Sequence, residues 1–322
     1  MSIYLSHRSA FEYWRANDPL PNLGPARARP LPGERPSKSE VDALDVRRFG
    51  VSAAPVHVAV AGANDRSQAK GLTCHVLSEP VRPGAFPRVE EGLYVASPEQ
   101  AFMDMSVELP LVELVRFGYL LCGTYVFDSG GGGFRRRLHG SPTTVEALRE
   151  RAEGARGERG VNRATRALRY VANGSASPME TNLAMALCLP RMLGGYGFEL
   201  PQLNARIEAR AHGSLMGRSY FECDLYWEEH KTAVEYDSAQ FHSGSKAEAR
   251  DSSRRSGLLI RDVLVITVTT DQFFDARKLD EAARALAKRM GKRLPANNAS
   301  WMMKRYELRA GFLQDLPGPR QD

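Results

Sequence analysis

Cysteine is scarce in this 322-residue chain, and its four cysteines are far apart. Because no two of them form a Cys-x-x-Cys pair, the sequence predicts neither a zinc ribbon nor a disulfide framework. Long apolar runs are also missing. The most apolar stretch, residues 109–127, is interrupted by Glu113 and Arg116, which a bilayer-spanning helix accommodates only at high energetic cost. The N-terminus lacks the apolar segment of a signal peptide. We therefore expect a cytoplasmic protein with reduced thiols.

What is present is an ordinary globular composition with a mild basic excess. Hydrophobic residues make up 43% of the chain and charged residues 25%, as in proteins that fold around an apolar core. The length fits two modest domains. The formal net charge of +6 favours a polyanionic partner such as nucleic acid, although many proteins without such a partner share it.

The N-terminal half predicts short strands alternating with helices. Strand-like runs cover residues 56–60, 72–77 and 93–96, and Gly, Asn and Pro separate them. We expect an α+β domain of unknown role over residues 1–135, with target recognition and regulation as the open roles. A basic helical connector is expected over residues 136–175.

Arginine recurs in this connector at Arg163, Arg166 and Arg169, roughly on one helix face. A solvated face and a stripe that follows nucleic-acid phosphates both fit this spacing. The glycine run at residues 130–133 is not followed by the Gly-Lys-Ser/Thr of a phosphate-binding loop, so it predicts an ordinary loop.

Three soft metal ligands of the N-terminal half, His57, Cys74 and His75, lie on or near expected strands. They could meet at a metal ion, but their spacing matches no established ligand pattern. They therefore give only weak evidence for a metal site.

The C-terminal half has a clearer order of elements, and with it we expect an α/β protein overall. The expected order is helix 177–189, strands 198–203, 219–227 and 232–237, helix 246–259, strand 263–269 and helix 276–290. This order defines a domain over residues 176–293, followed by a tail over residues 294–322.

Carboxylates stand in two neighbouring strands of this domain. Alternation of side chains places Glu222 and Asp224 on one face of the first strand, and Glu235 and Asp237 on one face of the second. If the strands form a hairpin, three or four carboxylates converge on one side of the sheet. Their mutual repulsion is offset by a divalent cation, and oxygen ligands suit Mg²⁺ or the similar Mn²⁺. Such a cation activates water and neutralises a phosphate oxygen, which points to phosphodiester hydrolysis.

The motif Asp224, then Glu235-Tyr236-Asp237 after a short turn, resembles the core of PD-(D/E)XK nucleases. The pattern is most similar to the Vsr-like and DUF559-type branch, in which an E-x-D motif is followed by a histidine and then by a helix with Asp and Arg. The resemblance covers about 115 residues and implies a restriction-endonuclease-like core, a mixed sheet flanked by helices, with DNA as the expected substrate. It implies metal binding by Asp224, Glu235 and Asp237, proton transfer by His242, an acidic role for Glu180 on the first helix, and phosphate contact by Arg254 and Arg255.

Two departures from this pattern stand out. The signature lysine is absent and Asp237 holds its place, while Ser238 replaces the usual glycine. Lys231 and Lys246 could supply the missing charge, and nothing in the sequence selects either of them. Structural alternatives stay open for other members: Glu222 faces solvent, Glu180 completes a capping box with Ser177, Asp251 and Arg254 form a helical ion pair, and His242 is an ordinary loop histidine.

Residues 92–104 faintly resemble a stretch of AbiEi-type antitoxin proteins. This similarity implies a role in regulation or phage defence. The sequence thus predicts a Mg²⁺-dependent endonuclease, with a non-catalytic nucleic-acid-binding regulator on a degenerate nuclease fold as the alternative.

Overall fold

The computed structural model describes residues 2–18, 36–52, 54–77, 81–128, 133–208, 220–237 and 256–313. The chain divides into two compact units, unit 1 from Met1 to Val171 and unit 2 from Ala172 to Pro317. Both units combine helices with β-sheet, and the larger sheet of each contains parallel and antiparallel pairs. The expected α/β class is confirmed.

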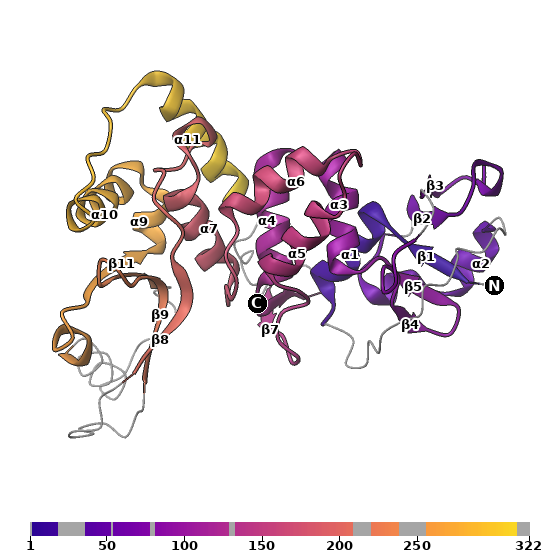
Figure 1. The fold of residues 1–322 in the computed structure, drawn as a ribbon, viewed down its shortest axis with the longest axis horizontal. Coiled ribbons are helices and arrows are strands. Elements are labelled where there is room, and N and C mark those ends of the chain that lie inside the picture. The colour runs from indigo at the N-terminus through magenta and orange to yellow at the C-terminus, as the bar shows by residue number, and fades with distance from the viewer. Residues whose placement is uncertain are drawn as a thin grey trace, which may run out of the picture. The chain divides into compact units, whose positions relative to one another are not determined.

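Unit 1 is built on a five-stranded sheet of order β3-β2-β1-β5-β4 (Figure 1). Its strands are β1 (Ile3–Leu5), β2 (Val56–Val60), β3 (Leu72–Val76), β4 (Arg88–Glu90) and β5 (Leu93–Val95). β1 lies at the centre, parallel to β5 and antiparallel to β2, while β2 and β3 are parallel. The three strands predicted in this half are confirmed.

The helices of unit 1 begin where the sequence supplies caps. Ser97 accepts a hydrogen bond from the Gln100 amide at the start of α3, with Pro98 in the first turn, and Ser37 forms a capping box with Glu40 at α2. The helices are α1 (His7–Ala16), α2 (Lys38–Ala43), α3 (Pro98–Glu108), α4 (Leu111–Cys122), α5 (Val145–Glu153) and α6 (Val161–Ala167).

The predicted connector over residues 136–175 is not a separate element. Its helices α5 and α6 pack against α3, and α6 also packs against α4, so nearly all of it belongs to unit 1. The reason is visible in its pattern, because Leu148, Ala164 and Leu168 are buried while Arg149 and Arg166 are exposed. Just before it, β6 (Tyr125–Phe127) and β7 (Phe134–Arg136) pair as a hairpin around the glycine run, most of which lies outside the described residues.

Unit 2 contains a four-stranded sheet of order β11-β10-β9-β8. Its strands are β8 (Gln202–Glu208), β9 (Tyr220–Trp227), β10 (Thr232–Asp237) and β11 (Leu264–Thr269). β8, β9 and β10 are antiparallel neighbours, and β11 runs parallel to β10. The first strand lies at residues 202–208 instead of the expected 198–203, and the other three agree with prediction.

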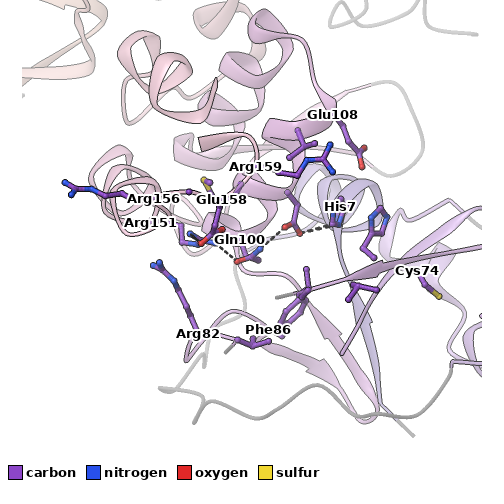
Figure 2. Close-up of a pocket in the computed structure, with 18 of the residues that line it drawn as sticks. His7, Cys74, Arg82, Phe86, Gln100, Glu108, Arg151, Arg156, Glu158 and Arg159 are labelled. Atoms are coloured by element: carbon purple, nitrogen blue, oxygen red, sulfur yellow. Dashed lines mark hydrogen bonds and ion pairs between the residues drawn. The ribbon is translucent and has the colours of Figure 1, made fainter. Parts of the chain in front are cut away.

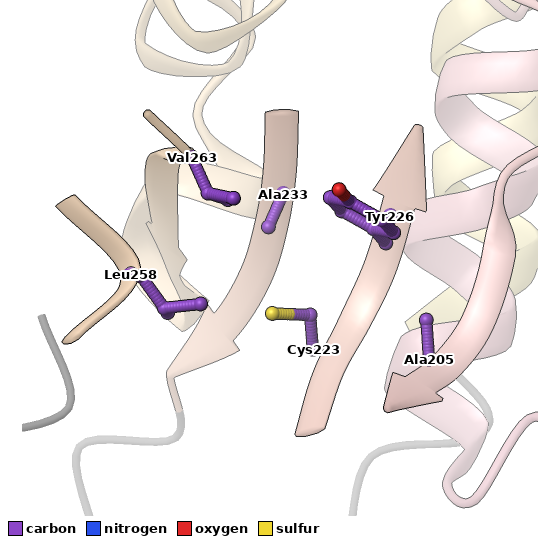
Figure 3. Close-up of a cluster of buried hydrophobic side chains, with 6 residues drawn as sticks. All are labelled: Ala205, Cys223, Tyr226, Ala233, Leu258 and Val263. Carbon is purple, nitrogen blue, oxygen red and sulfur yellow. The ribbon is translucent and has the colours of Figure 1, made fainter. Parts of the chain in front are cut away.

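Side-chain alternation breaks in the middle of β9. Cys223 and Tyr226 would point to opposite faces of a regular strand, yet both contribute to one buried cluster with Ala205, Ala233 and Leu258 (Figure 3). The break falls beside Asn204, which adopts a left-handed backbone with φ 49° and stands opposite Asp224 in the register of β8 and β9. A local departure of this kind is invisible to period-two counting.

Helices α7 (Pro178–Cys188), α9 (Thr270–Phe274), α10 (Ala276–Arg289) and α11 (Ala299–Phe312) complete unit 2. The predicted tail therefore contains a helix that belongs to the domain. Trp301 and Arg305 of α11 are buried, and the Arg305 guanidinium lies 2.8 Å from the Asp280 carboxylate of α10. None of the described helices has both the length and the apolarity to cross a membrane.

Candidate metal centres

The predicted acidic site forms one row across the sheet of unit 2. Leu225 pairs with Val234, so the next pair in this register is Asp224 with Glu235. Glu235 is in turn the register partner of Thr267 on the parallel strand β11. The Asp224 Oδ2 atom accepts a hydrogen bond from the Tyr236 amide at 2.9 Å. The Asp224 side chain thus continues the pairing of β9 with β10 beyond the Leu225–Val234 pair.

The acids do not all share one face, which corrects the prediction. Alternation along β10 places Glu235 and Asp237 on the face of Ala233, which packs with Cys223. Glu222 precedes Cys223 and so points to the opposite face, where its carboxylate lies 3.7 Å from Arg206 Nε of the paired strand. The break at Asp224 separates Glu222 from Glu235 and Asp237 and places it near Glu180, whose pKa its charge helps to raise.

Glu180 of α7 is 9% exposed and bonds to the polypeptide on two sides. Its Oε2 accepts hydrogen bonds from the Ala176 amide at 2.8 Å and from Asn204 Nδ2 at 2.6 Å. Ser177 caps the helix by accepting from the Glu180 amide, so only half of the anticipated capping box is present. Burial raises the pKa of the Glu180 carboxyl above its ordinary value, against the hydrogen bonds that lower it. Asn204 stands opposite Asp224 in the register of β8 and β9. Its bond to Glu180 therefore places the Glu180 carboxylate beside the row formed by Asp224 and Glu235.

The acidic row does not form a compact triad of ligand atoms. Among the described residues, one group of three His, Cys, Asp or Glu side chains has its ligand atoms within 4.8 Å of one another, and it lies in unit 1. Predicted partners of the row at Ser238, His242, Lys246, Asp251, Arg254 and Arg255 lie outside the described residues. Their arrangement around Asp224 and Glu235 stays a prediction.

Lys231 does not stand in for the missing lysine of the motif. It occupies the turn that leads into β10, with φ 44°, four residues before Glu235. At the rise of an extended strand, this separation corresponds to roughly 13 Å along the sheet. That distance exceeds the reach of a lysine side chain.

The three arginines of the connector are not equivalent. The Arg163 Nη1 atom lies 3.1 Å from each of the carbonyl oxygens of Ser106, Val107 and Leu109, where α3 ends. These carbonyls have no partner within the helix, so Arg163 has a structural role that spacing alone did not reveal. Arg166 and Arg169 are exposed, and their contact with phosphate stays a prediction.

A second polar centre lies in unit 1, where three histidines converge. His57 of β2 and His75 of β3 share a face in the parallel register, and His57 Nδ1 lies 2.9 Å from His75 Nε2. His7, which opens α1 directly after the central strand, stacks on His75 with ring centroids 3.5 Å apart and planes 12° apart. Glu108, at the end of α3, completes the group of three with His7 and His75.

A chain of polar contacts leads from this group into α5. The Asp104 Oδ2 atom accepts from the His7 amide at 3.4 Å, Gln100 donates to Asp104 Oδ1 at 2.7 Å, and Arg151 donates to Gln100 at 3.1 Å. These side chains line a cavity of about 960 Å³, whose wall also carries His75, Glu108 and several arginines. Figure 2 shows the polar chain running along this wall.

Burial controls protonation in this centre. Desolvation, reinforced by the neighbouring histidines, lowers the pKa of His7 to about 3 and that of His75 to about 4. Desolvation also raises the pKa of Asp104 to about 6. Both imidazoles are therefore neutral at pH 7, which is the form that binds metal ions.

Sequence reasoning found half of this centre. It placed His57 and His75 together as candidate ligands but grouped them with Cys74. The Cys74 sulfur accepts from the Ser67 amide at 3.2 Å and points away from His7 in Figure 2, because Cys74 and His75 are consecutive in a strand. His7 and Glu108 were missed because the topology, and no sequence spacing, brings them to the strand ends.

Comparison with known proteins does not assign either centre. The chain matches no protein-family model, no curated protein and no solved structure.

Proposed function

We propose that unit 2 is a Mg²⁺-dependent endonuclease that hydrolyses phosphodiester bonds in DNA. The observation that carries the proposal is the adjacency of Asp224 and Glu235 on neighbouring strands, where the Asp224 carboxylate takes over a backbone position in the pairing. Two carboxylates at such a point suit Mg²⁺, which usually binds only one or two protein carboxylates and keeps several waters. The order α7, β8, β9, β10, β11 also agrees with the resemblance to PD-(D/E)XK nucleases.

The residues have distinct proposed roles. Asp224 and Glu235 hold the cation, which supplies an activated water and neutralises charge on the phosphate when bound. Asp237, on the face of Glu235, binds the cation or orients the water. His242 moves the proton, and Arg254 and Arg255 contact phosphate, since a guanidinium fork matches its oxygens. Glu180 supports the row through Asn204.

A non-catalytic nucleic-acid-binding regulator is the second candidate. Two observations favour it: an aspartate replaces the signature lysine, and one carboxylate oxygen of Asp224 accepts from the Tyr236 amide. Under this alternative, the protein binds DNA without cleaving it, and unit 1 serves regulation.

Plasmid nicking with and without Mg²⁺ or Mn²⁺ separates the two candidates. We expect metal-dependent nicking by the full-length protein and its loss in Glu235→Gln. Glu228→Gln is the matched control, because Glu228 is an exposed acid in the turn after β9 that accepts a hydrogen bond from Gln202, and it should nick normally. Absence of nicking with intact DNA binding would reject the nuclease and leave the regulator. Equal loss in both variants would point to a general effect of removing acids from this sheet.

A further inference from the structure

We propose that His7, His75 and Glu108 of unit 1 form a binding site for one divalent transition-metal ion of the Zn²⁺ class. Their ligand atoms all lie within 4.8 Å of one another. They come from three different elements, α1, β3 and α3, so the fold and not a local turn brings them together. This inference concerns a different unit and a different metal class from the proposed nuclease.

The donor set decides the class of metal. Two imidazole nitrogens with one carboxylate oxygen suit Zn²⁺ and its first-row neighbours, whereas Mg²⁺ and Ca²⁺ prefer oxygen ligands alone. Three protein ligands leave at least one coordination position for water or a bound molecule, as in catalytic zinc sites. Both His7 and His75 line the cavity of about 960 Å³, so that position is open to it.

The surroundings hold the ligands as the outer shell of a metal site does. Metal-binding histidines usually bond through their second ring nitrogen to another protein group, which fixes the ring. His75 does so through Nε2, 2.9 Å from His57, which leaves its Nδ1 for the metal. The Nδ1 atom of His7 lies 3.6 Å from the Asp104 carboxylate, buried and without a hydrogen-bond partner. A small movement of the ring gives His7 the matching outer bond.

The backbone of His7 supports a functional role for this position. Its φ of 45° is uncommon for a residue other than glycine, and residues held in such conformations concentrate at functional sites. The conformation directs the His7 ring onto His75.

Binding requires one ring to turn. The rings of His7 and His75 are nearly parallel at 3.5 Å, and a metal ion lies in the plane of each imidazole that binds it, so a single ion cannot lie in both planes as they stand. Rotation of the His7 ring about χ2 resolves this, because its Nδ1 has no hydrogen bond to lose, whereas rotation of His75 would break its contact with His57.

Titration of the full-length protein with Co²⁺ tests the site through visible absorption, which is much stronger for four-coordinate than for six-coordinate Co²⁺. We expect one equivalent to bind with the four-coordinate signature and to be displaced by Zn²⁺. Glu108→Gln changes an exposed ligand and should weaken binding at least about 10-fold. His7→Asn should do the same, since asparagine tolerates the left-handed backbone. Glu158→Gln is the matched control and should bind Co²⁺ as the unaltered protein does. Glu158 lines the same cavity and pairs with Arg151, but it is not one of the three proposed ligands.

Unchanged Co²⁺ affinity in both Glu108→Gln and His7→Asn would overturn the proposal, and so would a six-coordinate spectrum or no binding by the unaltered protein. Circular dichroism of each variant verifies that it is folded. Repeating the titration in Glu235→Ala separates this proposal from the nuclease: the unit 1 signal persists there whether or not unit 2 cleaves DNA.

Discussion

The two centres of this protein differ in how they are encoded. In unit 2, the acids lie close in sequence, on two strands joined by a short turn, and form an extended row. In unit 1, His7, His75 and Glu108 are separated by up to about a hundred residues and meet within 4.8 Å. Sequence spacing therefore identified the acidic centre of unit 2, whose ligand atoms are spread out. The compact centre of unit 1 arises only from the way the chain folds. The comparison shows that a motif predicts proximity along a sheet but not the convergence of ligand atoms.

The largest expected effect comes from Asp224, which has a structural role as a hydrogen-bond acceptor and a proposed role as a metal ligand. Asp224→Asn keeps an oxygen that accepts from the Tyr236 amide but removes the negative charge that a cation requires. We expect this variant to remain folded and to lose about 100-fold or more of the metal-dependent nicking rate. Asp224→Ala should also lose about 1 kcal/mol of unfolding free energy, because the partly buried Tyr236 amide loses its acceptor. Nicking assays and urea unfolding of both variants measure the difference. Full activity in Asp224→Asn would remove Asp224 from the proposed cation site.

Features of the fold that depend on local sequence patterns could be predicted, and features that depend on packing between distant segments could not. Strands 56–60 and 232–237 agree residue for residue with the structure, because their apolar patterns are local. The predicted start of unit 2 at residue 176 lies close to Ala172, but the predicted end of the first domain at residue 135 and the end of unit 2 at residue 293 were too early. α5, α6 and α11 bury apolar faces that are visible only as packing. The irregularity at Asn204 and Asp224 moved Glu222 to the other face, and single-strand periodicity cannot register a change that involves two strands.

The second prediction concerns Asp104, the buried acid of unit 1. Its folded-state pKa of about 6 exceeds the ordinary 3.8, so its contribution to stability is full below pH 3.8 and is lost as the pH rises through 6. Asp104→Asn removes that loss. Relative to the unaltered protein, its unfolding free energy should rise by on the order of 2 kcal/mol between pH 4 and pH 7.

Urea unfolding with a chelator present measures this relative change at each pH, which excludes bound metal as its source. Only the difference between the two proteins is informative, because His7 and His75 titrate with the opposite sign. Their lowered pKa values make the folded state bind fewer protons, so their contribution rises with pH up to about 6.5. A constant difference between the proteins from pH 4 to pH 7 would contradict the assigned burial of Asp104.

The third prediction treats Glu180, the corresponding buried acid of unit 2. Burial raises its pKa as well, so its contribution is full below the ordinary 4.5 and falls as the pH rises through the folded-state value. Glu180→Gln removes this pH-dependent loss of stability. At pH 7 the unfolding free energy of the variant should lie within about 1 kcal/mol of that of the unaltered protein, because the glutamine amide oxygen can still accept a hydrogen bond from the Ala176 amide or from Asn204. If Glu180 only supports the row, nicking changes less than about 10-fold. Loss of nicking as large as in Asp224→Asn would make Glu180 a member of the catalytic site.

The smallest expected effect distinguishes Arg163 from Arg166. Arg163→Ala removes the donor to the carbonyls at the end of α3 and should cost about 1 kcal/mol of unfolding free energy, with Gln as the partial rescue because it retains a donor. Arg166→Ala should change the unfolding free energy by less than about 0.5 kcal/mol, since the side chain is exposed. If Arg166 contacts phosphate, the slope of log affinity for DNA against log salt falls by about one in Arg166→Ala. The two assignments would be reversed if the slope were unchanged in Arg166→Ala and reduced in Arg163→Ala. The salt dependence reports only the charges that contact phosphate, and an arginine that caps a helix does not contribute to it.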